Sequence, residues 1–520
     1  EHALKRRRDN LREAATEYYE NLAKAVNIHA SNKAELVRIE RESDDHVVVP
    51  LNALDGGAGN NGAIFKRRFD ADDTREIRLY LYDGADSVHI SGDVASSIVV
   101  RVVGGDGSDV VIDKSTVSGY ALAFLPIPDA ETTTFVYDDG KKTRLELGAS
   151  ASYDDDPMRA PIDEAQRYEP LVEDFGHNWR VGPWLGFTSD MGLFVGGGPI
   201  LYEYGFQADP YVYRMALLAG YATNAKSFKV QYTGDFRSLI DGARVGVLAR
   251  ASGIEVHNFY GLGNESQRIE EADKANHYNV VQQQLTFRPE LGIPVFDGAE
   301  VIVGADVTHT KSAEPNEIRF VNTIRPYGLE PMTIANGSVG IRIDTRDVEL
   351  NASKGVLFDV RGEYYPTLLD NAAAFTKIKG EARTYFTADW PLETTLALRA
   401  AAEHNIGDSI PFYKAAVLGG TGSLRGYPID RFIGNTSLAA NAELRVGLFN
   451  FNVLFPGVFG ITAAVESGRV FTDDDVSKRW HAAVGGGLYL TFIERSLTLS
   501  ASGMQSPEAL RIYVAGGFAF

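Results

Sequence analysis

The sequence predicts an all-β fold: a 16-stranded antiparallel transmembrane β-barrel over residues 181–520, with a small N-terminal β-domain preceded by a helix. Three observations predict it. About sixteen segments alternate apolar and polar residues, as strands do when one face meets an apolar phase and the other a wet interior. Long connections follow the odd-numbered segments, and tighter turns follow the even-numbered ones. No stretch reaches the roughly 18 consecutive apolar residues of a transmembrane helix, whereas a barrel strand needs only about 10 residues.

The alternation is clearest in residues 228–237, where Phe228, Val230, Tyr232 and Phe236 share one face and polar residues occupy the other. One such strand fits a soluble sandwich as well as a barrel, but an even set of about sixteen favours a bacterial barrel. The segments are centred near Leu185, Val195, Leu217, Val230, Val247, Gln282, Val303, Ile341, Phe358, Ala382, Leu398, Ala442, Ile461, Gly486, Leu499 and Val514.

The connections between these segments differ in length on the two rims. Long ones on one rim and short ones on the other are typical of an outer-membrane barrel whose two chain ends both lie in the periplasm. The long connections are expected around residues 258–275, 311–331, 405–434 and 467–479, and the short turns include 389–393 and 493–495.

The longest connection contains a glycine-rich segment with one arginine, Val417 to Tyr427. Such a loop either extends into solvent or folds back into the lumen. Glycine allows close backbone approach and positive φ, so an arginine flanked by glycines favours the lumen. The candidate residues of this loop motif are Gly419, Gly420, Arg425, Gly426 and Tyr427.

The chain ends in a strand-like pattern in which Phe518 and Phe520 remain in phase with the preceding apolar residues. A final aromatic residue suits a strand that is read by an outer-membrane insertion machine, so both residues are candidate insertion signals. The tryptophans lie where interfacial girdles are expected. They are Trp179, Trp184, Trp390 and Trp480.

Composition excludes several function classes. The net charge of −19 disfavours nucleic acid as a partner. The chain has no cysteine, which excludes disulfide, iron–sulfur and thiolate chemistry. It has no P-loop, no ligand-spaced histidine pair and no G-x-S-x-G elbow, so we expect neither an enzyme nor a cofactor. The first residue is not Met, and we expect a processed or truncated chain, with the question of missing upstream domains left open.

Residues 1–33 form a predicted helical segment. Apolar residues recur at helical spacing between Asp9 and Val26, and the basic run Lys5–Arg8 precedes them. The run either contacts anionic lipid head groups or is simply the solvated approach to the helix, and the second interpretation is favoured.

Residues 34–148 form a predicted β-rich domain with a weak internal repeat, Asp83–Val88 and Asp106–Val111, arranged as a sandwich or a short solenoid. Gly104–Val111 also fits a calcium-binding nonapeptide, but tandem copies are missing, so Asp-Gly turns are favoured and no metal is predicted. Residues 149–180 form a predicted linker, whose Asp154-Asp155-Asp156 triplet is interpreted as hydrated charge rather than a divalent-ion site.

Three motifs occur in order along the barrel region: Ile343–Asp347 followed by Lys354-Gly355, Leu418–Tyr427 followed by Asn441–Arg445, and Val465–Phe471. They resemble the D-T-R-D, R-G-F/Y and F-x-D-x-G motifs of the outer-membrane-protein-85 superfamily, which includes BamA-like insertases and TpsB secretion pores. The resemblance covers about 340 residues.

The resemblance implies a loop between strands eleven and twelve that folds into the lumen. It implies that Arg425 at the loop tip pairs with acids on strands twelve and thirteen, which are Glu443 and Glu466 here. Glu466 stands where the family usually has Asp. An arginine in a partly dehydrated lumen needs such carboxylate partners.

The N-terminal part departs from classical members, because residues 34–148 lack the β-α-α-β-β pattern of POTRA modules. Together with Asn258–Glu265, this part resembles the C-terminal half of Bacteroidota-type proteins that join a metallophosphoesterase to such a barrel. The metal-ligand motifs of that enzyme (D-x-H, G-D-x-x-D, G-N-H-D/E) do not occur in this sequence.

We therefore expect an outer-membrane barrel of the insertase and translocase superfamily that handles a polypeptide or lipid client or anchors a periplasmic module. Its partners would be outer-membrane lipid, the client, and periplasmic or outer-membrane proteins. The mechanism would combine the arginine loop with weak pairing between the first and last strands, where Gly182, Pro183 and Gly186 indicate a thin seam or a bend. The alternatives are a passive porin and a membrane anchor for an upstream metallophosphoesterase.

Overall fold

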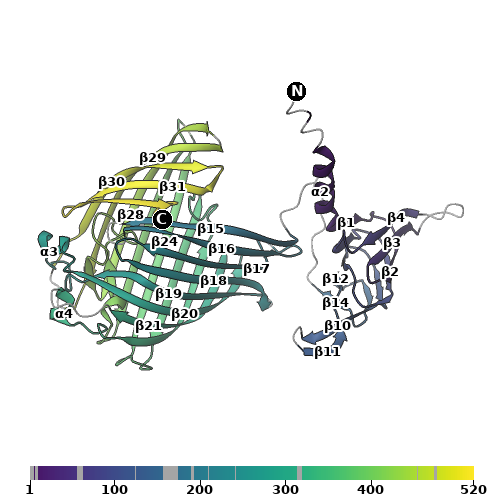
Figure 1. The fold of residues 1–520 in the computed structure, drawn as a ribbon, viewed down its shortest axis with the longest axis horizontal. Coiled ribbons are helices and arrows are strands. Elements are labelled where there is room, and N and C mark those ends of the chain that lie inside the picture. Colours follow the sequence, from purple (N-terminus) through teal and green to yellow (C-terminus); the bar gives the residue numbers. More distant parts are fainter. Residues whose placement is uncertain are drawn as a thin grey trace. The chain divides into compact units, whose positions relative to one another are not determined.

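The computed structural model describes residues 5, 10–54, 63–122, 125–155, 174–188, 192–208, 210–240, 242–312, 319–389, 391–453, 455–473 and 477–520. The chain forms two compact units, Glu1–Phe175 and Gly176–Phe520, both built from strands (Figure 1). Among the helices of the described part, none has the length and apolar character needed to cross a bilayer, a finding that concerns helices alone.

The helix α2 (Leu11–Ala23) opens the first unit. The predicted helix extended to Val26, but that residue lies in strand β1 (Ala25–His29). The reason is packing: Ile28 is buried in the core of the unit and Val26 packs against that core, and β-branched side chains favour a half-buried strand over a helix. Of the predicted basic run, Lys5 alone lies within the described residues.

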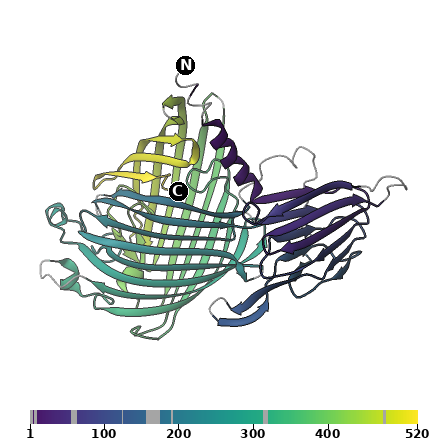
Figure 2. The ribbon, with the colours of Figure 1, turned by 45° about the vertical axis from the view of Figure 1, so that its right-hand side comes forward.

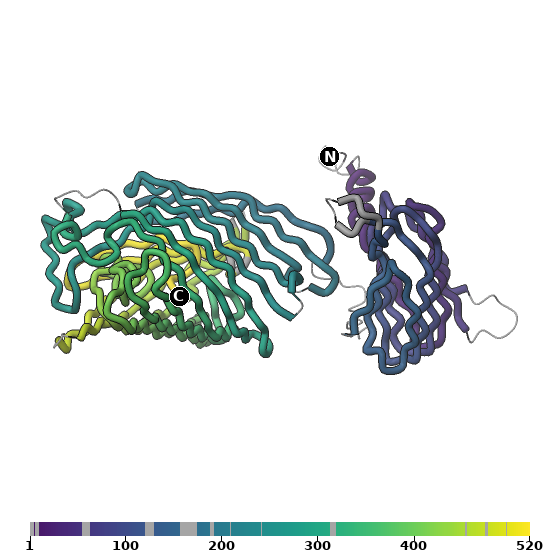
Figure 3. Tube along the Cα trace, turned by 90° about the horizontal axis from the view of Figure 1, so that it is seen from below, coloured from purple at the N-terminus to yellow at the C-terminus, as the bar shows by residue number. Residues whose placement is uncertain are grey.

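Two sheets with parallel pairing make up most of the unit, and Figure 3 shows their strands running side by side. One has the order β1-β5-β8-β12-β14 and the other β13-β9-β6-β2-β3-β4, in which β3 and β4 are antiparallel. The two copies of the Asp-Gly repeat connect equivalent strands, β5 to β6 and β8 to β9. Stacked parallel strands with a repeated turn are the arrangement of a short solenoid.

The strands of the first unit are β1 (Ala25–His29), β2 (Glu35–Ser43), β3 (His46–Ala53), β4 (Ala63–Asp70), β5 (Glu76–Tyr80), β6 (Ser87–Ser91), β7 (Asp93–Val94), β8 (Val99–Val103), β9 (Val110–Asp113), β10 (Thr116–Leu122), β11 (Leu125–Ala130), β12 (Thr134–Tyr137), β13 (Arg144–Glu146) and β14 (Ala151–Asp154). The described part of residues 25–155 contains no helix, and so does not show the POTRA order of elements there.

The strands cross the predicted domain limits. Strand β1 belongs to the β-rich domain although it lies within predicted segment 1–33, and β14 lies within the predicted linker. The barrel begins at Gly176, five residues before the predicted limit of 181. Linker residues 156–173, Asp156 included, lie outside the described residues.

Sixteen strands within the described residues close the second unit into a barrel in which neighbours in sequence are neighbours in space (Figure 2). Each of the sixteen predicted segment centres falls within its own strand, so the predicted fold is confirmed. The strands are β15 (Gly176–Thr188), β16 (Gly192–Tyr204), β17 (Tyr213–Ala222), β18 (Ser227–Ile240), β19 (Ala243–Asn258), β20 (Asn279–Phe296), β21 (Ala299–Ser312), β22 (Met332–Asp344), β23 (Gly355–Tyr365), β24 (Phe375–Ala388), β25 (Thr394–Ile406), β28 (Thr436–Val453), β29 (Phe455–Phe471), β30 (His481–Phe492), β31 (Glu494–Gln505) and β32 (Leu510–Gly516).

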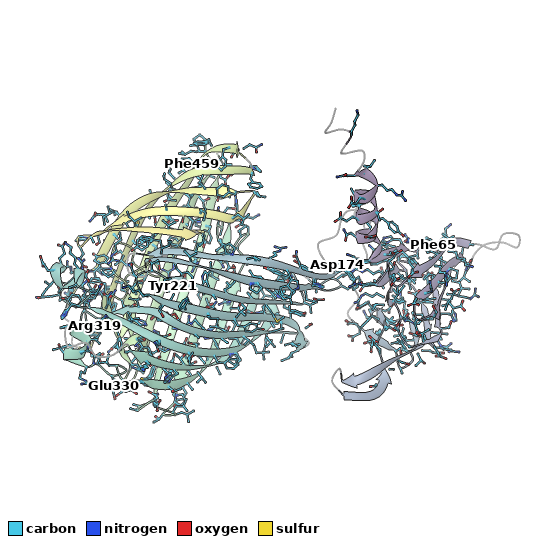
Figure 4. The ribbon with its side chains drawn as sticks, viewed as in Figure 1. Phe65, Asp174, Tyr221, Arg319, Glu330 and Phe459 are labelled. Atoms are coloured by element: carbon cyan, nitrogen blue, oxygen red, sulfur yellow. The ribbon has the colours of Figure 1, made fainter. Side chains whose placement is uncertain are left out.

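Alternation along the strands separates two surfaces. Large apolar side chains such as Val230, Val339 and Leu488 are exposed on the outside, and Figure 4 labels two outward aromatic positions, Tyr221 and Phe459. Charged side chains face the bore and pair across neighbouring strands, as Arg342 of β22 does with Asp359 of β23 at 2.7 Å. The barrel is therefore apolar outside and charged inside.

The connections confirm the predicted asymmetry. The rim opposite the start of β15 carries the long loops, including the helices α3 (Glu270–Lys274) and α4 (Phe320–Ile324). The rim where β15 begins carries short turns, apart from longer connections at residues 205–212 and 345–354. Of the tryptophans, Trp179 and Trp184 lie on β15, Trp480 immediately precedes β30, and Trp390 lies outside the described residues.

The predicted strand to the C-terminus is wrong in its last residues. Strand β32 ends at Gly516, and Gly517 adopts a left-handed backbone with φ of 78°, which glycine tolerates and other residues rarely adopt. In two perpendicular views the C-terminus lies within the outline of the barrel (Figures 1 and 3). Phe518 and Phe520 are thus outside the ladder, and their role as an insertion signal stays a prediction.

Candidate functional site

The loop at residues 407–435 connects β25 to β28, the eleventh and twelfth barrel strands. It contains a 3-10 turn, η1 (Phe412–Lys414), and a hairpin of β26 (Ala416–Leu418) with β27 (Phe432–Gly434). Its apolar side chains Leu418, Leu424, Tyr427 and Phe432 are buried against barrel-wall residues. Those wall residues are Ala439, Val470, Ala483, Met504 and Tyr513. The loop therefore packs inside the bore.

Arg425 lies at the tip of this loop, between two carboxylates of the wall. Its Nε is 2.6 Å from Oε1 of Glu466, and its Nη2 is 2.9 Å from Oε2 of Glu443. The backbone N–H of Arg425 donates to the second oxygen of Glu466 at 2.6 Å. Arg425, Glu443 and Glu466 are 4 %, 2 % and 1 % exposed, so the three charges are removed from bulk water and depend on one another.

Strand register explains why the two acids meet. Glu443 on β28 and Glu466 on β29 both occupy inward positions, and Glu466 stands opposite Asn441 in the ladder, one inward position from Glu443. The same alternation brings Arg445 inward, where its Nε lies 3.0 Å from the free oxygen of Glu443. The cluster therefore holds two cations and two anions in alternating order along the chain Glu466–Arg425–Glu443–Arg445.

The glycines of the motif shape the loop tip. Gly419, Gly420 and Gly426 have φ of 127°, 76° and 92°, a region that other residues rarely adopt. A Cβ on Gly419 would also collide with the carbonyl oxygen of Pro428. These glycines allow the tip to turn tightly enough for Arg425 to reach both acids.

The remaining motif residues fix the tip to the wall beyond the arginine. The N–H of Gly426 donates to the Tyr513 hydroxyl at 3.2 Å, and Ser506 Oγ donates to the Gly426 carbonyl at 2.7 Å. The Tyr427 ring lies edge-on to Phe432 with ring centres 5.4 Å apart. The loop tip is thus bound to β32 and to the turn after β31, as well as to β28 and β29.

Several residues that hold the base of the loop were not expected from the sequence. His257 Nδ1 lies 2.6 Å from Asp430 Oδ2, and Asn258 donates to the Ile429 carbonyl at 2.9 Å. Arg431 pairs with Glu508 at 2.9 Å. No spacing in the sequence relates these residues, because the partners are separated by 77 to 173 positions.

The C-terminal residues Phe518 and Phe520 contact the same charged cluster through Arg445. The guanidinium carbon of Arg445 lies 3.9 Å from the Phe518 ring centre, and Arg445 Nη2 donates to a main-chain carboxyl oxygen of Phe520, the last residue, at 2.5 Å. Phe520 is buried with Ala352, Tyr385 and Ala397. Arg445 is two positions after Glu443 on the same strand, so the alternation of the strand could have predicted that it faces the bore. No signal in the sequence linked Arg445 to the C-terminus.

Below the cluster, Phe518 and Phe520 line a cavity of about 500 Å³ in the bore. Its other walls carry both signs of charge, including Arg342, Asp359 and Glu381. Within the described residues, no group of three or more His, Asp or Glu side chains is arranged to hold a metal ion. The arrangement joins the tip of the loop to two barrel strands through buried ion pairs.

A family comparison matches residues 213–491 to the Omp85 superfamily domain. The chain belongs to the Omp85 superfamily. The match covers more than half of the sequence and includes both acids and the arginine of the cluster. This Omp85 chain is accordingly a bacterial outer-membrane barrel with its N-terminal domain in the periplasm, and the rim where β15 begins is the periplasmic rim.

Similar solved structures include BamA from Haemophilus ducreyi lacking POTRA domains 1–3, with 14% identity, TM-score 0.47, and coverage of 77% of this chain and 74% of that one. CdiB from Escherichia coli has 14% identity, TM-score 0.44, and coverage of 66% and 63%. CdiB from Acinetobacter baumannii has 13% identity, TM-score 0.39, and coverage of 65% and 59%. A comparison with curated protein sequences gave no match.

Proposed function

We propose that this Omp85 barrel inserts or translocates a polypeptide or lipid client at the outer membrane, with the 407–435 loop acting as a plug that Arg425 holds in the lumen. The observation that supports it most is the buried cluster of Arg425, Glu443 and Glu466. A loop that only decorates the surface needs no such cluster, whose breakage costs about 3–5 kcal/mol by leaving a buried charge unpaired.

The seam between the first and last strands supports the same proposal. Strand β15 makes thirteen ladder pairs with β16 but one, Phe187 with Val514, with β32. Hydrogen bonds of the ladder are what holds neighbouring strands together, so the seam is the weakest joint of the barrel wall. A client would pass through or pair at this joint. The process needs no nucleotide, in keeping with the absence of a P-loop in the sequence.

The proposal is tested by site-specific photocrosslinking in the native membrane. A photoreactive residue replaces Leu185, which is exposed on the outer face of β15 beside the seam, and in a matched control it replaces Leu217 on β17, also exposed. We expect client adducts at 185, identified by mass spectrometry, that exceed those at 217 and depend on continuing protein or lipid export. Equal adduct patterns at the two positions would overturn the proposal.

The alternative function, a passive porin, differs from a plugged barrel in its conductance. A porin keeps a steady open pore in the intact protein, whereas a plugged barrel conducts weakly and intermittently until the plug is loosened. The bore of this chain is occupied by the 407–435 loop, which favours the plugged barrel.

A further inference from the structure

Residues 258–266, which we term the strap, begin at the last residue of β19, on the rim of the long loops. Gly261 and Gly263 have φ of 100° and 83°, values that other residues rarely adopt, so the strap can turn sharply at both glycines. Asn258 and Asn264 on either side of the turns are each 1% exposed. Buried amides need hydrogen-bond partners, and these two find them on different parts of the barrel.

One set of contacts joins the strap to the 407–435 loop. The side-chain Nδ2 of Asn258 donates to the Ile429 carbonyl at 2.9 Å, and the N–H of Gly263 donates to the Ile433 carbonyl at 2.8 Å. Both acceptors are main-chain oxygens that would otherwise need a partner in a buried position. The strap therefore holds the backbone of the loop four to eight residues after its tip.

Arg431 of the loop adds a further contact with the strap. Its guanidinium carbon lies 4.7 Å from the Tyr260 ring centre and 4.5 Å from the Phe432 ring centre. Its Nη1 donates to Oγ of Ser266 and its Nη2 to the Ser266 carbonyl, each at 2.8 Å. A guanidinium stacks through its faces and donates in its plane, so Arg431 is held by the strap in both directions.

Asn264 fastens the other side of the strap to the barrel wall. Its Nδ2 donates to the Val470 carbonyl at 2.6 Å, and its Oδ1 accepts from the Val470 N–H at 3.0 Å. These are the two bonds that a residue of a neighbouring antiparallel strand makes with its partner. The described pairing of β30 with β29 reaches only to Gly468 opposite His481. The Asn264 side chain thus takes the place of a strand residue at the outer end of β29.

We propose that the strap is a second fastening of the 407–435 loop, which holds the outer end of the loop to β29 through Asn264 while the wall acids hold the tip through Arg425. This inference rests on the proposed function in that the loop is a plug, and it adds how the plug is released. The strap engages residues 429–433 and the acids engage Arg425. Loosening one site frees one part of the loop, and full release requires both.

Single cysteines report the two parts of the loop separately, because the chain contains no cysteine of its own. Ile433→Cys reports the outer end, since Ile433 is buried together with Phe259 of the strap. Leu424→Cys reports the tip, since Leu424 is buried next to Arg425. A water-soluble maleimide labels each cysteine in the full-length protein in bilayer nanodiscs. The labelling rate follows the population in which that part of the loop is open.

Asn264→Asp is the decisive variant, because it keeps the size of the side chain but puts an oxygen in place of the donor to Val470. A residue that only fills space would tolerate this change. We expect labelling of Ile433→Cys to accelerate at least about fivefold, since one hydrogen bond is lost and two oxygens face each other. Labelling of Leu424→Cys should stay unchanged.

Two further variants complete the comparison. Arg425→Ala should give the reverse pattern, with faster labelling of Leu424→Cys and an unchanged rate at Ile433→Cys. Gln267→Glu is the matched control, because it makes the same amide-to-acid change at an exposed position immediately after the strap. It should alter neither rate.

Two results would overturn the strap. One is a labelling rate of Ile433→Cys in folded Asn264→Asp protein, verified by heat-dependent mobility on gels, equal to that in Gln267→Glu. The other is equal acceleration at both cysteines, which would show a single fastening. If Asn264→Asp does not fold, Asn258→Ala takes its place in the same comparison, with a smaller acceleration expected because one hydrogen bond to the Ile429 carbonyl is lost.

The labelling needs no client, so it separates the strap from the proposed function. Client adducts at position 185 together with unchanged labelling at position 433 would retain the proposed function and reject the strap. Labelling that depends on Asn264 in a protein that gives no client adducts would retain the strap and reject the handling of a client.

Discussion

Arg425 of the loop and Glu443 of the wall lie 2.9 Å apart, and the other oxygen of the same carboxylate accepts from Arg445. One acid thus joins the loop in the bore to Arg445, the residue that contacts Phe518 and Phe520. The arrangement ties two parts of the barrel that are far apart in sequence to a single buried charge. Changes at Glu443 should therefore affect both the loop and the contacts of Phe518 and Phe520 with Arg445.

Glu466→Asp should weaken the loop clamp even though the family usually has Asp at this position. Glu466 reaches both Nε and the backbone N–H of Arg425 at 2.6 Å, and a side chain shorter by one methylene loses at least one of these bonds. We expect a loss of about 1–3 kcal/mol in stability, measured as a lower urea midpoint for the folded band on gels. Asp359→Asn, which removes a wall acid that pairs with Arg342, is the control and should shift the midpoint less. Equal midpoints for the two variants would contradict the clamp.

Gly419→Ala should disrupt the loop tip, whereas Gly422→Ala should be tolerated. Gly419 has φ of 127° and its Cβ would collide with backbone, while no atom lies within 4 Å of a Cβ on Gly422. The two glycines are three positions apart in the same loop, so they form a matched pair. We expect limited proteolysis to cut within residues 407–435 in the first variant and not in the second, with a stability cost for Gly419→Ala of more than about 1 kcal/mol. Resistance of both variants would show that the tip conformation does not matter.

Asp86→Asn should change how the stability of the periplasmic domain depends on pH. Burial, together with the charges of Asp109 and Glu35, raises the pKa of Asp86 to about 7 from an ordinary value of 3.8. Because the folded domain binds this proton more tightly than the unfolded one, the stabilising contribution is complete below 3.8 and is lost as the pH rises through about 7. One pKa unit corresponds to about 1.4 kcal/mol, so the domain should be clearly less stable at pH 8 than at pH 5.

The measurement is hydrogen–deuterium exchange of β6 and β9 in the full-length protein, with each variant compared with the parent at the same pH. Asp86→Asn keeps an acceptor for the Glu35 N–H, which bonds Asp86 at 2.7 Å, and should slow exchange at pH 8 more than at pH 5. Asp73→Asn, at an exposed turn position, is the control. A stabilisation by Asp86→Asn that is the same at both pH values would contradict the assignment.

The alternation of apolar and polar residues was enough to locate every barrel strand along the sequence. Each strand carries this signal locally, because every second side chain faces lipid and is apolar. The loop position between β25 and β28 followed from the same count. Contacts such as Arg445 with Phe518 have no local signal, since they depend on how the chain turns at Gly517. Adjacent glycines such as Gly516-Gly517 do not indicate a strand end by themselves, because Gly196-Gly197-Gly198 lies within β16.

The first unit was harder to predict from the sequence. Its strands are short, and parallel pairing requires partners more than twenty residues apart, such as Ile77 of β5 with Val100 of β8. Val26 fits the helical spacing of residues 9–26 and also, together with Ile28, the alternation of a strand, and the core contacts decide between the two. The same holds for β14, which lies in a stretch with the composition of a linker.

Single-channel conductance in planar bilayers tests the central claim, that a loop clamped by Arg425 plugs this Omp85 barrel, most directly. We expect the unchanged chain to conduct weakly and intermittently, Arg425→Ala to open steadily with a conductance at least about threefold higher, and Arg342→Gln to resemble the unchanged chain. A large steady pore in the unchanged chain, or identical traces from Arg425→Ala and Arg342→Gln, would contradict the claim.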